Sequence, residues 1–184
     1  MMDISVSRRR LFGMAGAATV GMTMLPTVGL ARNAPGEGER KLNFYHLHTG
    51  ERLSATYWSG GTYEVEELDR INWLLRDFRN DQRAEIDVRL LDTLYRLSNT
   101  LEISKPLHII SAYRSPATNE MLIRKGHGVA KRSMHLSGKA IDIRVPGRRL
   151  KDVRRAALAM AAGGVGYYPS SNFLHLDTGR VRRW

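Results

Sequence analysis

Apolar residues recur along the chain at two spacings, one typical of helices and one typical of strands. Over residues 64–79 and again over residues 87–99 they return every three or four positions, which places them on one helical face. Asp87 stands where a helix N-terminal cap is expected. The two stripes consist of Val65, Leu68, Ile71, Leu75 and Phe78, and of Val88, Leu91, Leu94 and Tyr95. We therefore expect two amphipathic helices that pack on a common core.

Extended segments precede and follow these helices. Residues 42–47 and 52–58 flank a glycine-containing turn and predict a hairpin, and residues 107–110 predict a buried strand. The remaining predicted elements are helices at residues 118–125 and 150–162 and strands at residues 140–145, 165–168 and 173–177. Helices combined with mostly antiparallel strands predict an α+β fold, a single domain in which helices pack on a small, mostly antiparallel sheet.

Two of these strands place polar side chains on defined faces. Strict alternation puts Ile141 and Ile143 on one face of a predicted strand and Asp142 on the other. By the same rule, His175 and Asp177 share one face of the last predicted strand. These polar faces are where we expect chemistry.

The composition supports one globular domain and restricts that chemistry. The 184 residues are 42% hydrophobic and 26% charged, which is ordinary for a folded domain and not for a disordered or fibrous chain. Cysteine is absent, so disulfides, thiolate metal sites and a cysteine nucleophile are excluded. The net charge of +11 favours polyanionic partners such as nucleic acid, anionic lipid or an acidic wall polymer.

The first residues predict export. Ser7-Arg8-Arg9-Arg10-Leu11 leads into an uncharged apolar stretch, and small residues follow up to Ala31. This pattern predicts a signal peptide over residues 1–31. Its start resembles a twin-arginine signal, and an ordinary Sec signal is the alternative. The stretch is shorter than the roughly 20 residues that span a bilayer, so no stable membrane anchor is expected. We expect a linker at residues 32–41 and a periplasmic domain at residues 42–184.

Three polar residues of the second half can converge. His135 and Asp142 are seven positions apart, and a turn at Gly138 brings an imidazole and a carboxylate together. His175 can complete a set of two histidines and one aspartate, which suits zinc with water in the fourth tetrahedral position, although iron is conceivable. The residues alone leave a second interpretation open, in which His135 is a hydrogen-bonded loop residue and Asp142 pairs with Arg144.

The pattern Ser-x-His-x-x-Gly-x-Ala-x-Asp, present from Ser133 to Asp142, resembles the zinc D-Ala-D-Ala carboxypeptidase and hedgehog-type metallopeptidase superfamily. The segments that are further similar to its periplasmic murein endopeptidases are residues 111–115, 163–169 and 172–179 and the terminal Trp184. The resemblance implies a hedgehog-type peptidase fold and one zinc ion (Zn2+). It also implies His135, Asp142 and His175 as the metal ligands.

Catalytic roles also follow from the resemblance. It implies that Arg114 steadies an oxyanion or a substrate carboxylate, the alternative being a surface arginine paired with an acid. Relatives often carry an acid three residues before the last histidine, but Asn172 stands there and cannot accept a proton. Asp177 is therefore expected to act either as the general base or as the acceptor that orients a ligand imidazole.

Aromatic residues and further histidines complete the candidates. The residues expected to line the substrate groove are Tyr113, Tyr167 and Tyr168. Aromatic residues beside glycine-rich strands also serve simply as packing residues. His46 and His48 have no acidic partner at ligand spacing, so we expect structural or surface roles for them. His108 is expected in the core and His127 in a loop near the cleft.

Several functions compete at this point. Zinc-dependent hydrolysis of amides in peptidoglycan stem peptides, by an endopeptidase acting at cross-links that involve diaminopimelate, follows from the resemblance. Residues 32–184 keep 26 Lys and Arg against 17 Asp and Glu, which suits an acidic polymer. The alternatives are a D-amino-acid carboxypeptidase acting on stem peptides and a non-catalytic, zinc-stabilised wall-binding module. Nucleic acid is disfavoured as a partner by export and by the lack of a binding motif. A monomer is expected.

Overall fold

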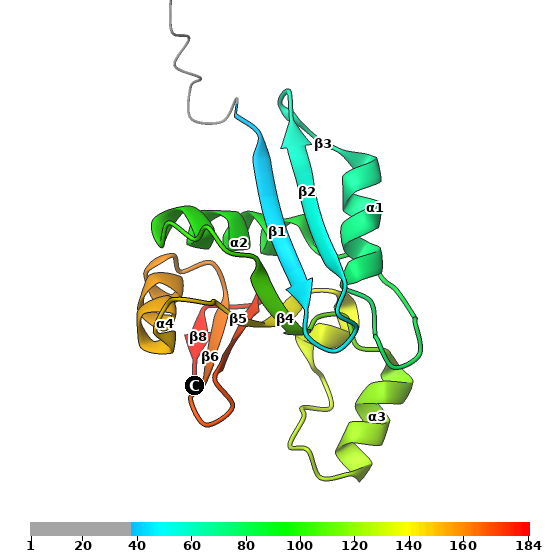
Figure 1. The fold of residues 1–184 in the computed structure, drawn as a ribbon. Helices are drawn as coiled ribbons and strands as arrows, with labels where there is room; N and C mark the ends of the chain where they lie inside the picture. The colour runs from blue at the N-terminus through cyan, green and yellow to red at the C-terminus, as the bar shows by residue number, and fades with distance from the viewer. Residues whose placement is uncertain (1–37) are drawn as a thin grey trace, which may run out of the picture. The chain divides into compact units, whose positions relative to one another are not determined.

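The computed structural model describes residues 38–184 (Figure 1). The expected signal peptide and residues 32–37 of the expected linker lie outside the described residues. The helices are α1 (Val65–Leu74), α2 (Val88–Thr100), α3 (Pro116–Arg124), the 3-10 helix η1 (Met134–Ser137) and α4 (Leu150–Ala159). The strands are β1 (Arg40–His46), β2 (Arg52–Ser59), β3 (Thr62–Tyr63), β4 (Leu107–Ser111), β5 (Ala140–Arg144), β6 (Gly164–Tyr168), β7 (Phe173–Asp177) and β8 (Arg182–Arg183).

All of the strands belong to one sheet, in the order β3-β2-β1-β4-β5-β7-β6-β8. The pairs β1–β4 and β6–β8 are parallel, and the other neighbours are antiparallel. The predicted α+β fold with a mostly antiparallel sheet is therefore confirmed. Within residues 38–184, none of the helices has the length and apolar character needed to cross a membrane.

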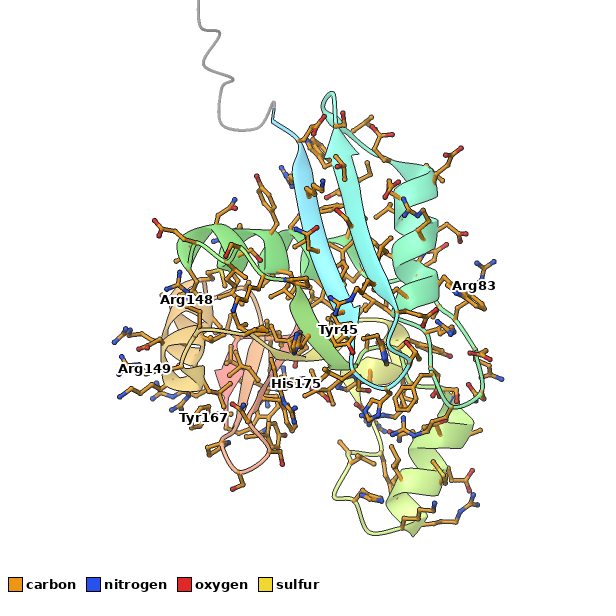
Figure 2. The ribbon with its side chains drawn as sticks, viewed as in Figure 1. Tyr45, Arg83, Arg148, Arg149, Tyr167 and His175 are labelled. Carbon is orange, nitrogen blue, oxygen red and sulfur yellow. The ribbon has the colours of Figure 1, made fainter. Side chains whose placement is uncertain are left out.

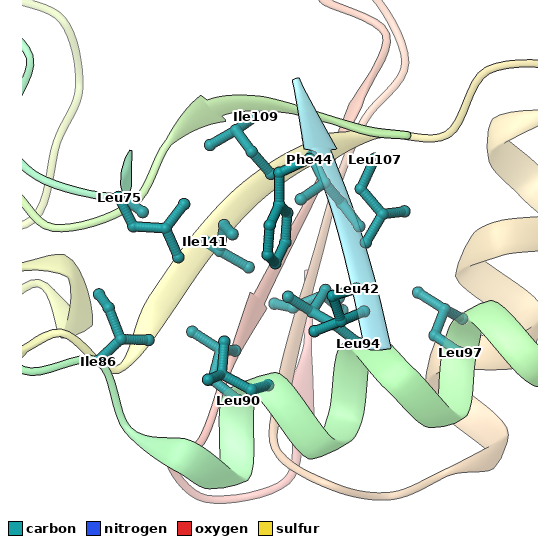
Figure 3. Close-up of a cluster of buried hydrophobic side chains, with 14 of the residues drawn as sticks. Leu42, Phe44, Leu75, Ile86, Leu90, Leu94, Leu97, Leu107, Ile109 and Ile141 are labelled. Carbon is teal, nitrogen blue, oxygen red and sulfur yellow. The ribbon is translucent and has the colours of Figure 1, made fainter. Parts of the chain in front are cut away.

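The hydrophobic core lies between the sheet and the helices. Leu90, Leu94 and Leu97 project from α2 toward Leu42 and Phe44 of β1, and all five are almost completely buried (Figure 3). Burying a side chain of this size stabilises the fold by roughly 1.5–3 kcal/mol. The apolar positions of β4, β5 and β7 join the same cluster. Because side chains alternate along a strand, the intervening residues of β5 and β7 face the other side of the sheet.

Helix α1 is shorter than the apolar stripe predicts. It ends at Leu74, so Phe78 lies outside the helix and stacks its ring on His48, with ring centroids 4.3 Å apart. Val65, expected in the stripe, is 78% exposed. The loop that follows α1 is held by Asp77, whose carboxylate accepts hydrogen bonds from the backbone N and Oγ of Ser115 at 2.9 and 2.7 Å. These contacts fix the chain away from the helical path.

The other elements lie close to their predicted positions. Asp87 caps α2 as expected, accepting from the backbone N of Arg89 at 3.0 Å. Helix α3 begins two residues earlier than predicted because Ser115 caps it and Pro116 occupies its first turn. Helix α4 ends at Ala159, three residues early. The two-residue strands β3 and β8 were not predicted.

The bend between η1 and β5 depends on Gly138. Its φ of 66° is left-handed, and its carbonyl accepts a hydrogen bond from the backbone N of Asp87 at 3.0 Å. A Cβ at this position would collide with the backbone carbonyl of Glu85. Glycine is therefore required both by backbone conformation and by space.

We expect Gly138→Ala to destabilise the protein far more than Gly147→Ala. Gly147 also has a positive φ, of 81°, but a Cβ there would meet no atom within 4 Å. The control should lose about 1–2 kcal/mol through the left-handed backbone alone. Gly138→Ala adds a backbone collision and should lose at least about 3 kcal/mol. Urea unfolding of both variants measures the difference, and equal losses would contradict the role given to the Glu85 contact.

Candidate metal centre

The pairing of β5 with β7 brings together two of the three candidate ligands. In this antiparallel ladder Asp142 lies directly opposite His175. Directly opposite residues carry their side chains on the same face, with Cβ atoms about 5 Å apart. Ile141 and Ile143 point to the core and are fully buried, so Asp142 and His175 face away from it, as the alternation predicts.

His135 approaches from η1, which the end of β4 holds in place. Its Nδ1 lies 2.6 Å from the carbonyl oxygen of Ala112, and its own carbonyl accepts a hydrogen bond from the backbone N of Arg114 at 3.1 Å. Ser133 caps η1 by accepting from the backbone N of His135 at 3.3 Å. A carbonyl oxygen can only accept, so Nδ1 of His135 donates and Nε2 is left with a lone pair.

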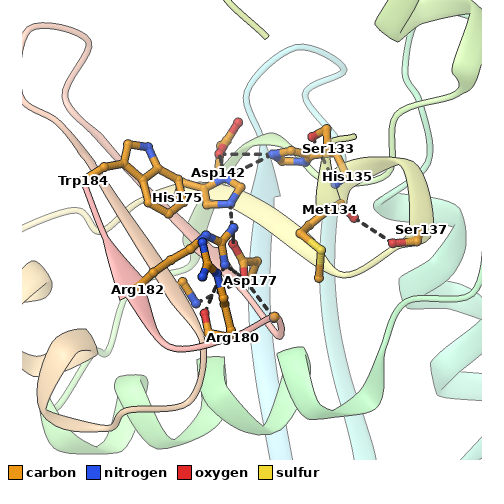
Figure 4. Close-up of polar contacts among 12 residues, drawn as sticks. Ser133, Met134, His135, Ser137, Asp142, His175, Asp177, Arg180, Arg182 and Trp184 are labelled. Atoms are coloured by element: carbon orange, nitrogen blue, oxygen red, sulfur yellow. Dashed lines mark hydrogen bonds and ion pairs between the residues drawn. The ribbon is translucent and has the colours of Figure 1, made fainter. Parts of the chain in front are cut away.

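The three side chains converge on one point (Figure 4). Nε2 of His135 lies 3.2 Å from Nδ1 of His175, which lies 2.9 Å from Oδ1 of Asp142. The same Oδ1 lies 3.4 Å from Nε2 of His135. A tetrahedral zinc ion with ligands at about 2.0–2.1 Å separates its ligand atoms by about 3.4 Å. The donor atoms are therefore spaced as one metal ion would require.

The electrostatics of the trio favour a cation at its centre. Burial would raise the pKa of Asp142, but the neighbouring His135 and His175 imidazoles lower it on balance, so the carboxylate is ionised. Burial would lower the pKa of His175, but its hydrogen bonds with Asp142 and Asp177 raise it on balance. With both rings neutral, lone pairs of two nitrogens and one carboxylate oxygen meet in a buried site, which is costly unless a proton or a metal ion lies between them.

Asp177 contacts His175 at the ring nitrogen that points away from His135 and Asp142. Its Oδ2 is 3.1 Å from Nε2 of His175, while Nδ1 of the same ring faces Asp142. Its carboxylate also accepts hydrogen bonds from Arg182 and from the backbone N of Gly164 and Gly179. Burial opposes ionisation, but these donors hold the pKa of Asp177 well below its usual range. This geometry favours the orienting role among the two that the sequence left open.

The trio forms part of the wall of an open pocket of about 470 Å³, a volume within the usual range of ligand sites. Three arginines, Arg114, Arg132 and Arg182, line the same pocket. In the described part of the chain, Asp142 is the one acidic residue in this wall, and His127 is its one histidine outside the trio. Neither Asp177 nor Asn172 belongs to the wall.

Arg114 reaches the pocket from the segment after β4, at the end of the buried strand where the sequence places it. It is buried, and Nη1 donates to Oδ1 of Asn119 at 3.3 Å. Its Nε has no hydrogen-bond partner among the described residues. The residue lines the pocket wall, and the planar fork of donors of a guanidinium suits a carbonyl or carboxylate oxygen of a ligand. The alternative of a surface arginine paired with an acid does not match this placement.

The three candidate tyrosines have different surroundings. Tyr168 lines the pocket and stacks on Phe173, with ring centroids 4.4 Å apart. Tyr167 packs against the hydrophobic core, and the guanidinium of Arg154 on α4 lies 4.9 Å from the centre of its ring. Tyr113 packs against the apolar core. The structure therefore brings Tyr168 to the site, whereas Tyr113 and Tyr167 do not line the pocket. Tyr167 is turned away because alternate residues of β6 face opposite sides of the sheet.

The remaining polar candidates also have defined places. Arg144, the alternative partner of Asp142, instead donates to the backbone carbonyls of Ser171 and Asn172 at 3.0 Å each. His46 shapes the turn after β1, because its Nδ1 accepts from the backbone N of His48 and of Thr49, each at 3.3 Å. A structural role was expected for His46 and is confirmed.

His108 does not lie in the core. It is half-buried on the face of β4 opposite the helices, with its ring 5.2 Å from that of Tyr45. The expectation of a core histidine was wrong because β4 alternates and buries only Leu107, Ile109 and Ser111.

Sequence reasoning missed the C-terminal contribution to the site. Arg182 and Trp184 both line the pocket, and the Trp184 ring lies 5.3 Å from that of His175. The similarity of Trp184 to murein endopeptidases was the single signal available. The two-residue strand β8 carries no periodicity by which it could be found.

An α+β domain in which two imidazoles and one carboxylate converge at an open pocket has the arrangement of a hydrolase with a single metal ion. A family model described as peptidoglycan L,D-endopeptidase MepK matches residues 34–184. The chain belongs to this family, which confirms the resemblance to murein endopeptidases of the metallopeptidase superfamily.

Curated relatives support the same assignment over the full length. The chain is 44% identical over 184 residues to the peptidoglycan L,D-endopeptidase MepK of Escherichia coli (strain K12), covering 100% of both chains. It is 37% identical over 182 residues to a probable peptidoglycan L,D-endopeptidase MepK of Haemophilus influenzae, covering 98% of this chain and 97% of the relative. No solved structure matches the chain.

Proposed function

We propose that the protein is a zinc-dependent endopeptidase that hydrolyses amide bonds of peptidoglycan stem peptides, at cross-links that involve diaminopimelate. The observation that carries this proposal is the convergence of His135, Asp142 and His175 at the wall of an open pocket. Two nitrogen donors and one carboxylate suit zinc better than calcium or magnesium, which prefer oxygen ligands. Membership of the MepK family supports the substrate class.

Each residue of the site then has a distinct task. Nε2 of His135, Nδ1 of His175 and Oδ1 of Asp142 would hold the ion, which when bound would supply a Lewis acid and lower the pKa of a water toward 7. Asp177 keeps the proton of His175 on Nε2 and thereby leaves Nδ1 to the ion. Arg114 donates to the carbonyl oxygen of the scissile amide as negative charge develops there. Tyr168 forms an apolar part of the substrate groove.

We further propose that the protein works in the periplasm, where its polymer substrate lies. The twin-arginine-type leader expected over residues 1–31 and the relatives named as peptidoglycan endopeptidases support this location. Basic side chains such as Arg83, Arg148 and Arg149 are exposed on the surface (Figure 2). Their positive charge suits a polymer that carries free carboxylates.

Digestion of purified sacculi tests the proposed activity directly. We expect zinc-loaded protein to convert cross-linked muropeptide dimers into monomers, and a chelator to abolish the reaction until zinc is restored. His135→Gln should remove both bound zinc and activity, while the control His108→Gln, off the pocket wall, should keep both. Liquid chromatography with mass spectrometry identifies the products. Shortened stems with intact dimers would indicate a carboxypeptidase instead, and binding without products would indicate a wall-binding module.

Asp177→Asn separates orientation from proton transfer. Because an amide can also donate to Nε2, the substitution should weaken the preference for the ring form that binds metal. We expect zinc affinity to fall about 10–100-fold, with activity partly restored at high zinc concentration. Chelator competition measures the affinity. Unchanged zinc affinity with lost hydrolysis would assign Asp177 as the general base.

Arg114→Lys tests stabilisation of the developing charge. Lysine keeps the positive charge but loses the planar fork of donors. We expect kcat on muropeptide dimers to fall about 100-fold, the typical effect of losing one oxyanion donor, with zinc content unchanged. Steady-state kinetics and metal analysis of the folded variant provide the measurement. Full turnover in the variant would show that Arg114 makes no contact specific to the transition state.

A further inference from the structure

Strand β8 carries an arginine directly onto the carboxylate that contacts His175. Nη1 of Arg182 donates to Oδ1 of Asp177 at 3.0 Å, and Nη2 donates to Oδ2 at 2.7 Å. Two parallel bonds of this kind fix the plane of a carboxylate as well as its charge. The Asp177 side chain is fully buried, and that of Arg182 is 31% exposed. The pair therefore links the buried site to the last residues of the chain.

The same carboxylate oxygen serves both Arg182 and the metal ligand. Oδ2 of Asp177 accepts from Nη2 of Arg182 and lies 3.1 Å from Nε2 of His175. An ionised carboxylate can only accept, so it holds the His175 proton on Nε2. Nδ1 of His175 faces Asp142 at 2.9 Å and is the ring nitrogen directed at the point where a metal ion would bind both residues. The chain of contacts from β8 ends at the converging atoms of the trio (Figure 4).

The backbone of β6 lies very close to the side chains that make these contacts. A Cβ at Gly164 would collide with Oδ2 of Asp177 and lie 2.6 Å from Nη1 of Arg182. A Cβ at Gly166 would lie 2.7 Å from the ring of Trp184. Bare backbone at these two positions of β6 lets the C-terminal residues approach the site.

Backbone hydrogen bonds hold the C-terminal segment against the sheet edge. The backbone N of Trp184 donates to the carbonyl of Val165 at 3.2 Å, and the backbone N of Tyr167 donates to the carbonyl of Trp184 at 3.0 Å. Nε1 of the Trp184 indole donates to the hydroxyl of Tyr168 at 2.8 Å. Arg182 is thus presented from an ordered strand with little freedom to turn away.

We propose that Arg182 is a positioning residue of the metal centre, which acts through Asp177 to hold His175 with Nδ1 directed at the metal. This inference rests on the proposed function only in that the trio binds a metal ion. It goes further in giving Arg182, which also lines the pocket wall, a task at the metal centre that it performs through Asp177. A merely structural ion pair would tie down the C-terminus and leave metal affinity unchanged.

The decisive comparison is Arg182→Gln against Arg183→Gln in the full chain. Arg183 is the neighbouring residue of β8, is exposed and has no side-chain hydrogen bond among the described residues. Zinc affinity, measured by competition with a chromophoric chelator, should fall about 10–100-fold in Arg182→Gln and stay unchanged in Arg183→Gln. Arg182→Lys, which keeps the charge but loses the paired bonds, should fall between them.

A second readout needs no metal and no activity. NMR of the metal-free protein should show a hydrogen-bonded, slowly exchanging Nε2–H proton of His175 in the wild type and in Arg183→Gln, and loss of that signal in Arg182→Gln. Affinity within twofold of the control together with an unchanged Nε2–H signal would overturn the proposal, whatever the change in melting temperature. If the wild type itself bound no zinc, the proposed function would fail, and the NMR comparison would still decide the role of Arg182.

Discussion

The register of β5 against β7 is the constraint on which the site depends. It sets Asp142 opposite His175. The neighbouring apolar residues Ile141, Ile143 and Leu174 stabilise this register because they are fully buried on the other face of the sheet. A slip of one residue would turn those side chains out of the core and the polar pair into it. The hydrophobic energy of the core therefore also fixes the positions of two candidate ligands.

The site places a charged carboxylate and nitrogen lone pairs in a buried environment, where they are costly unless they are paired. His135, Asp142 and His175 are each less than a tenth exposed, so their solvation is lost on folding. The surrounding structure offsets part of this loss by giving each imidazole a fixed partner: the carbonyl of Ala112 for His135, and Asp177 with its own donors for His175. The result is a set of three donor atoms placed so that one cation can bind all of them.

Local sequence patterns correctly predicted the features that depend on neighbouring residues, such as strand faces and bends. Alternation placed Asp142 on the correct face, and the glycine at position 138 marked the bend before β5. The apolar stripe predicted a helix that extends to Phe78, but α1 ends at Leu74 because the loop that follows is held by hydrogen bonds from Ser115 to Asp77. The convergence of the ligands needs strand pairing, which no local pattern encodes, so resemblance was required to prefer a metal site over a hydrogen-bonded loop. Arg182 lies on a strand too short to show any periodicity.

X-ray absorption at the zinc edge of the loaded protein shows whether two imidazoles and one carboxylate bind a single zinc ion beside the pocket. We expect a shell of nitrogen and oxygen atoms at about 2.0–2.1 Å, with the outer scattering of two imidazole rings. A shell without imidazole scattering, or one built from oxygen atoms alone, would rule out this site.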